Sequence, residues 1–156
     1  GVTSTANYLI SMKSSELDIN PLVEYAGTQG PSGNGLNGGS YRFRMLTDIS
    51  YQIDDLRLAV QWRHLGPIKP SSAATSGSDP DNPGIREYDL FNLSGNYNLT
   101  DNLWIRFGVD NVLNDKPPYS GQNFSEDNDG MIGGSFASGR YDTLGRRYWM
   151  GARINF

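Results

Sequence analysis

Residues 42–65 read RFRMLTDISYQIDDLRLAVQWRHL, and this stretch decides the fold. Apolar side chains alternate with polar ones in its first half, which places Phe43, Met45, Ile49 and Tyr51 on one face. A polar step at 52–55 leads into a second alternating segment over 56–65. Alternation with a period of two is typical of β-strands, so the stretch predicts a β-hairpin with a tight turn.

The same pattern recurs along the chain. It predicts further strands near 89–99, 103–110 and 147–156, and residues 8–13 read as the end of a sixth. Long segments rich in Gly, Ser, Asn, Asp and Pro separate the hairpins, at 14–40, 66–87 and 111–146. Short and long connections therefore alternate, so that all short turns fall at one end of the sheet. Short turns at one end and long loops at the other are typical of a transmembrane β-barrel.

Strand length agrees with this prediction. Ten residues at about 3.3 Å each, tilted by roughly 40°, rise about 25 Å, which matches the apolar band of an outer-membrane barrel. The face opposite the apolar one carries arginines, at Arg57, Arg63, Arg106, Arg147 and Arg153. A water-filled lumen tolerates such residues. The alternative is a soluble β-domain that buries its apolar face and binds carbohydrate or protein through its loops.

Composition excludes several classes of protein. The 156 residues carry a net charge of -4, and the 13 Lys and Arg are spread along the chain, which argues against a nucleic-acid partner. Cysteine is absent, which removes disulfides, thiolate metal sites and cysteine nucleophiles. An aromatic share of 12% argues against disorder. The chain starts with Gly1 and no leader, so we expect it to be a processed or truncated product.

Two stretches carry a family resemblance. Residues 103–119, LWIRFGVDNVLNDKPPY, resemble the penultimate barrel strand of TonB-dependent outer-membrane receptors, and 145–156, GRRYWMGARINF, resemble their closing strand. The motif positions are Asn111, Asp115, Lys116, Pro117, Gly145 and Arg146. Residues 25–27, YAG, resemble the family weakly. The resemblance implies an all-β fold, an antiparallel transmembrane β-barrel of about 22 strands, of which this chain holds the last five or six.

The resemblance also implies a function. The chain would be the C-terminal part of a receptor that takes up a scarce nutrient, whether siderophore, vitamin or saccharide, and the plug domain would be absent from it. Its partners would be the N-terminal strands and plug of the same receptor, the TonB complex through the missing N-terminal region, outer-membrane lipid and the barrel-assembly machinery. The closing strand supplies the assembly signal, at Tyr148, Met150, Ile154 and Phe156. A passive porin or another outer-membrane barrel stays an alternative.

No catalytic, cofactor or metal site is predicted. Residues 125–130, SEDNDG, resemble a calcium loop but lack its closing glutamate, and His64 has no nucleophile motif beside it. Aromatic residues near strand ends are expected to form interfacial girdles, namely Tyr41, Tyr51, Trp62, Tyr88, Tyr97 and Tyr148. Those of the longest loop are the candidates for substrate contact, namely Tyr119, Phe124, Phe136 and Tyr141.

Overall fold

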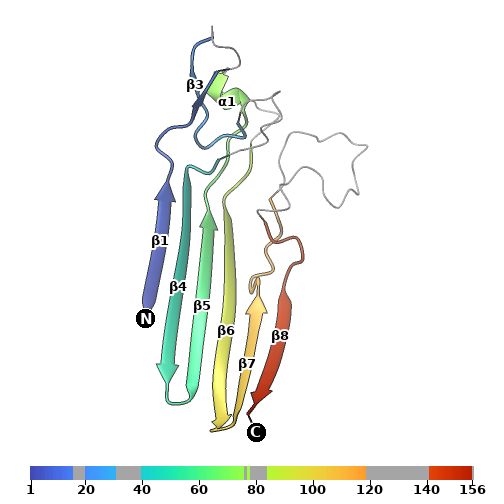
Figure 1. Ribbon diagram of the computed structural model, residues 1–156. Coiled ribbons are helices and arrows are strands. Elements are labelled where there is room, and N and C mark those ends of the chain that lie inside the picture. The colour runs from blue at the N-terminus through green and yellow to red at the C-terminus, as the bar shows by residue number, and fades with distance from the viewer. Residues whose placement is uncertain (16–19, 31–39, 76, 78–83, 119–140, 156) are drawn as a thin grey trace, which may run out of the picture.

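One open antiparallel sheet dominates the computed structural model, which describes residues 1–15, 20–30, 40–75, 77, 84–118 and 141–155 (Figure 1). Its six strands run in the order β1-β4-β5-β6-β7-β8, at Val2–Tyr8, Phe43–Ile53, Leu56–Leu65, Tyr88–Thr100, Leu103–Asp110 and Arg147–Ile154. Two short strands, β2 (Lys13–Ser14) and β3 (Val23–Glu24), form a separate pair, and α1 spans Ser72–Thr75. The all-β, antiparallel prediction is confirmed, and the described sheet is not closed.

The sixth strand lies earlier than predicted. It is β1 at Val2–Tyr8, not the segment 8–13. Tyr8 pairs with Phe43, the first residue of β4, so the chain beyond Tyr8 has no β4 residue left to pair with. Residues 2–8, VTSTANY, carry few large apolar side chains, and for this reason their alternation is weak in the sequence.

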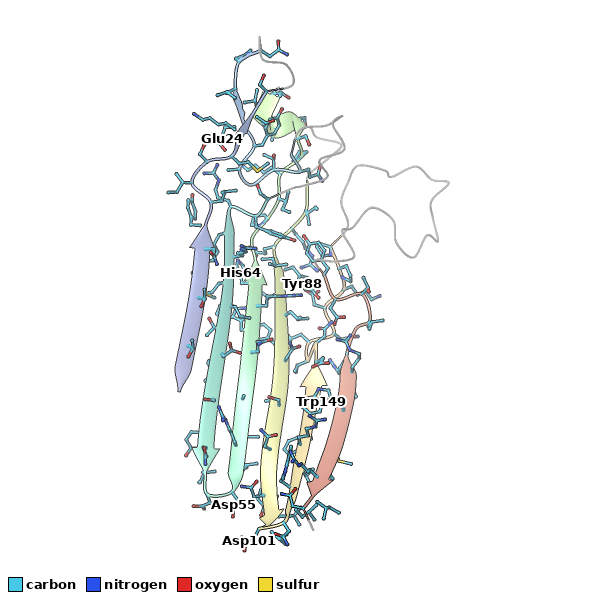
Figure 2. The ribbon with its side chains drawn as sticks, viewed as in Figure 1. Glu24, Asp55, His64, Tyr88, Asp101 and Trp149 are labelled. Carbon is cyan, nitrogen blue, oxygen red and sulfur yellow. The ribbon has the colours of Figure 1, made fainter. Side chains whose placement is uncertain are left out.

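The two ends of the sheet differ. Asp54 and Asp55 turn β4 into β5, with Asp54 at φ 46°, and Asp101 and Asn102 turn β6 into β7, where the Thr100 hydroxyl accepts from the Leu103 amide at 3.1 Å. Both turns lie at the lower end in Figure 1, the turn end, where Figure 2 labels Asp55 and Asp101. β2, β3 and α1 lie beyond the opposite end, the loop end.

Register gives the sheet two unlike faces. One continuous row crosses all six strands with apolar residues only, namely Val2, Ile49, Val60, Leu93, Val109 and Tyr148. The face that carries it is called the apolar face. Its opposite, the polar face, carries rows such as Thr3, Asp48, Gln61 and Asn92. Phe43, Leu58, Phe91 and Ile105 all share the apolar face.

No second layer covers the apolar face within the described residues. Ile49 and Met150 stay 47% and 80% exposed, although both are large apolar side chains. A contiguous apolar surface of this kind requires an apolar environment, either lipid or other protein. The described helix has only four residues, and none of the described helices is long and apolar enough to cross a membrane.

Glycines let large side chains lie flat on the sheet. Phe107 covers Gly95 on the apolar face, where a Cβ would come 2.5 Å from the ring. Trp149 covers Gly108 on the polar face in the same way, at 2.4 Å. Because a side chain at either glycine would collide with the ring, these contacts favour the observed pairing of β6, β7 and β8.

The buried core lies at the loop end. It comprises Leu65, Ile68, Ile85, Tyr88, Leu90 and Tyr141, with Tyr41 packed against it. Tyr88 is 0% exposed and pairs with Leu65 on the polar face, so its predicted place in an interfacial girdle is wrong. Tyr41 likewise packs against the core. Tyr51, Tyr97 and Tyr148 lie exposed on the apolar face, as a girdle requires.

Candidate functional site

The family-motif residues meet at the loop end of β7, in a cluster called the motif junction. Asn111 follows β7 with φ 52°, a left-handed conformation that asparagine tolerates, and is 1% exposed. Its side chain donates to the Asp115 carbonyl and accepts from the Asp115 amide, both at 2.9 Å. The Asn111 amide donates to Asn92 Oδ1 on β6 at 2.9 Å. Asn111 thus closes the turn and ties it to the sheet.

The approach to β8 is held by the same turn. Asn114 has φ 55° and its Oδ1 accepts from the Arg146 amide at 3.0 Å. Gly145 has φ 74°, and a Cβ there would lie 3.0 Å from Asn114 Oδ1. The glycine is therefore required both by its backbone conformation and by the closeness of Asn114. The 111–117 and 145–146 motifs, remote in sequence, form one unit.

An aspartate between the two motifs orders the last loop residues. Asp142 Oδ1 accepts from Arg147 Nη1 at 2.7 Å and from the Leu144 amide at 3.1 Å. Arg147 Nε also lies 3.6 Å from Asp110 Oδ2 at the end of β7. Burial raises the pKa of the Asp142 carboxyl, but its hydrogen bonds from Arg147 and Leu144 outweigh burial and leave the pKa below its usual range.

The 66–87 segment is fastened to the junction by Arg86. Its guanidinium pairs with both Asp115 carboxylate oxygens, at 2.9 and 3.4 Å, and also donates to the Lys116 carbonyl at 3.3 Å. Lys116 contributes this carbonyl, and Pro117 continues the chain. Two long connections are therefore joined by one bidentate ion pair.

Aromatic rings fill the space beside the junction. Tyr141 packs edge-on against Tyr88 at 5.3 Å and against Tyr41 at 6.5 Å between ring centroids. Tyr141 is 5% exposed, so contact with a substrate would require this cluster to open. The other candidates for substrate contact, Tyr119, Phe124 and Phe136, lie outside the described residues. Substrate contact by these four residues stays a prediction.

Glu24 organises a second hydrogen-bonded cluster, called the Glu24 knot, above the six-stranded sheet in Figure 2. Its carboxylate accepts from the Ser11 hydroxyl at 2.5 Å, the Met12 amide at 2.7 Å and the Ala26 amide at 2.9 Å. The Ser11 bond, followed by the two amide bonds, lowers the pKa of Glu24 to about 2. The knot joins the chain after β1 to the segment after β3, near the 25–27 stretch.

The single histidine lies on the apolar face near the loop end, where Figure 2 labels it. His64 Nδ1 is 2.8 Å from Asp89 Oδ1, and the Trp62 indole donates to the same oxygen at 2.7 Å. Phe91 stacks on Trp62, with ring centroids 5.7 Å apart. These hydrogen bonds give the His64, Trp62 and Asp89 side chains polar partners on an otherwise apolar face.

The structure describes only part of the residues on which the metal and assembly predictions rest. The described residues contain no cluster of three His, Asp or Glu side chains that suits a metal ion, and the 125–130 segment lies outside them. Tyr148, Met150 and Ile154 share the apolar face of β8, whereas Phe156 falls outside the described residues. Their role as an assembly signal stays a prediction.

The junction and the Glu24 knot can scaffold loops, because the side chains of Asn111, Arg86 and Glu24 bond to other atoms of the same chain. The sequence indicated the motif positions and placed Arg147 on the polar face, but it did not indicate Arg86, Asp142, Glu24 or the pairing of Arg147 with Asp142. One signal pointed toward Arg86 alone: a carboxylate such as Asp115 requires a cationic partner where it is partly buried.

Comparison with known proteins supports the fold. No protein-family model matches the sequence. No curated protein matches it either. Among solved structures, the chain is similar to a mutant ferric enterobactin receptor of Pseudomonas aeruginosa, with a TM-score of 0.57 and 21% identity. The match covers 99% of this chain and 20% of the receptor, so the chain spans about a fifth of that protein's length. At this identity the likeness shows the fold: a segment of an antiparallel barrel wall.

Proposed function

We propose that this chain is the C-terminal part of the barrel wall of a TonB-dependent outer-membrane receptor for active uptake of a scarce nutrient. One observation carries the proposal: an unbroken apolar row crosses six strands, while the opposite face is polar and arginine-bearing. A strand wall between lipid and a wet lumen requires this division. The barrel fold of the similar receptor supports it.

Each part of the chain has a role in this proposal. The apolar face contacts outer-membrane lipid, and the polar face lines the lumen around the plug. The motif junction and the Glu24 knot hold the bases of extracellular loops, which shape the mouth where nutrient binds. The TonB complex acts through the plug, the barrel-assembly machinery inserts the wall, and no catalytic step is involved. Siderophore, vitamin and saccharide all remain within the proposed substrate class.

A pair of adjacent residues tests the lipid-facing assignment. Leu93 and Ser94 are neighbours near the middle of β6 on opposite faces, and the chain has no cysteine of its own. We expect a fluorophore on Leu93→Cys of the full-length receptor to be quenched by brominated lipids, and one on Ser94→Cys to be spared. Spared emission at both positions would contradict a membrane wall and favour the soluble β-domain.

A second experiment separates active uptake from passive diffusion. Cells with the receptor gene deleted should regain growth on a limiting nutrient when the intact gene is restored, but only in a background with functional TonB. Equal rescue without TonB would instead support a passive porin. Candidate nutrients are supplied one at a time, so the substrate class is read from the same growth curves.

A further inference from the structure

Positive charge concentrates on the polar face, although the whole chain carries a net charge of -4. The strands place six arginines on this face against two aspartates, Asp48 and Asp110. Asp110 lies beside Arg147, and Asp48 accepts from Gln61. The face is therefore basic within a chain that is acidic elsewhere, and it attracts anionic partners.

Three of these arginines gather toward the turn end. Arg57, Asn96, Arg106 and Gly151 form one cross-strand row, and Arg153 lies in the next row beside Trp104. The three are exposed, and none has an ion pair within the part of the chain that the structure describes. They form the basic patch, defined as Arg57, Arg106 and Arg153. Guanidinium groups on neighbouring strands repel one another, and an anionic partner bound between them relieves this repulsion.

Arg57 lies apart from the other two arginines of the patch. Arg57 and Arg106 are two strands apart, or about 10 Å between Cα atoms. The Arg106 side chain lies across Gly151, since a Cβ there would come 3.0 Å from its Nε. Arg106 thus leans toward β8 and away from Arg57. One small oxyanion therefore cannot bridge all three guanidinium groups, whereas carboxylates spaced along a polypeptide can.

The surroundings of the patch suit a packed polypeptide. The next row toward the loop end consists of Ala59, Ser94, Gly108 and Trp149, in which small residues leave a flat floor and Trp149 lies over Gly108. Trp149, the third residue of β8, is labelled in Figure 2 on the upper half of that strand, and the residue is 39% exposed. Flat floor, aromatic ring and separated guanidinium groups together offer packing area and directed hydrogen bonds.

We infer that the basic patch docks an acidic polypeptide segment, which bears at least two carboxylates and packs against the polar face near the turn end. The inference rests on the proposed function, in which this face lines the lumen, and the acidic segment then belongs to the plug of the same receptor. Each guanidinium offers a planar pair of donors that a carboxylate binds at two points.

Zero-length cross-linking tests this inference in the full-length receptor in its membrane. Arg57→Lys, Arg106→Lys and Arg153→Lys keep the charge and supply an amine, which a water-soluble carbodiimide joins only to a carboxylate in direct contact. We expect isopeptide bonds from at least two positions to Asp or Glu of the plug, identified by mass spectrometry. The matched control is Tyr97→Lys, which neighbours Asn96 on the opposite face and should form none.

The outcomes are distinguishable from failure of the proposed function. Only receptor that resides in the outer membrane, and that migrates differently before and after boiling, enters the comparison; absence of such protein overturns the proposed function itself. With that protein in hand, no cross-link at the three positions overturns the inference, as does a link to another copy of the chain. Unsubstituted receptor supplies a check without mutation: phenylglyoxal should modify Arg57, Arg106 and Arg153 at least tenfold more slowly than the exposed Arg146, and equal rates also overturn the inference.

Discussion

Replacing Asn111 should open the motif junction while leaving the sheet intact. Asn111→Ala removes two side-chain hydrogen bonds, one to each backbone polar atom of Asp115. At about 1 kcal/mol each, their loss costs about 2 kcal/mol. Alanine at φ 52° adds roughly 1 kcal/mol of strain that asparagine tolerates better. The local opening free energy should therefore fall by about 3 kcal/mol.

A second substitution separates the contribution of the hydrogen bonds from that of the backbone strain. Asn111→Gly loses the same hydrogen bonds but adopts positive φ without strain, so its cost should be about 2 kcal/mol. Because 1.4 kcal/mol corresponds to a tenfold change, exchange should accelerate roughly 100-fold for Ala and roughly 30-fold for Gly.

Hydrogen exchange of peptides covering 103–118, in the full-length receptor in lipid nanodiscs, measures these rates. Asn102→Ala, in the exposed turn at the other end of β7, is the control and should leave this region unchanged. An alanine variant that exchanges within about threefold of the unsubstituted protein would refute the assigned role of the side chain. Equal rates for Ala and Gly would refute the contribution from backbone strain.

The remaining predictions concern the Glu24 knot, the polar face and the tyrosine cluster. The pKa of Glu24 is about 2 when folded, against an ordinary value of 4.5, so its stabilisation is full above pH 4.5 and is lost as pH falls toward 2. Limited proteolysis of the 9–30 segment should follow that change, and Glu24→Gln should be cleaved readily at every pH. Gly108→Val places a Cβ within 2.4 Å of the Trp149 ring and should shift tryptophan emission and cost about 1–3 kcal/mol in denaturant titrations, unlike Ser94→Ala. Tyr141→Ala should cost about 3 kcal/mol of local stability, read from exchange around Tyr88, and no change there would contradict the packing account.

Much of the sheet was predictable because alternation is a local property of the chain. In 42–65 each apolar residue must lie on the face of its second neighbour, so hairpin, turn and faces follow together. Leu46 and Thr47 blur that pattern, and the tertiary structure explains one of them. Thr47 lies on the apolar face but shares a hydrogen bond with Ser4 of β1, at 2.8 Å between the hydroxyl oxygens.

Other features depend on which strands become neighbours. Tyr88 lies at the first position of β6, and only its pairing with Leu65 assigns it to the polar face and the core. The basic patch likewise joins three strands whose arginines are up to 96 positions apart, between Arg57 and Arg153. No short segment of sequence predicts that these arginines lie close together, because their proximity depends on the register of several strand pairs.

The motif junction shows both levels in one place. The bonds between Asn111 and Asp115 span four residues, so a motif of asparagine, aspartate and proline already indicates a tight turn. Arg86, Asp142 and Arg147 reach the junction from other parts of the chain, and no local sequence pattern predicts their ion pairs. Turns and strand faces are determined by steric and hydrogen-bonding preferences of residues close together in the sequence. Ion pairs between loops form only after the sheet has brought the bases of those loops together.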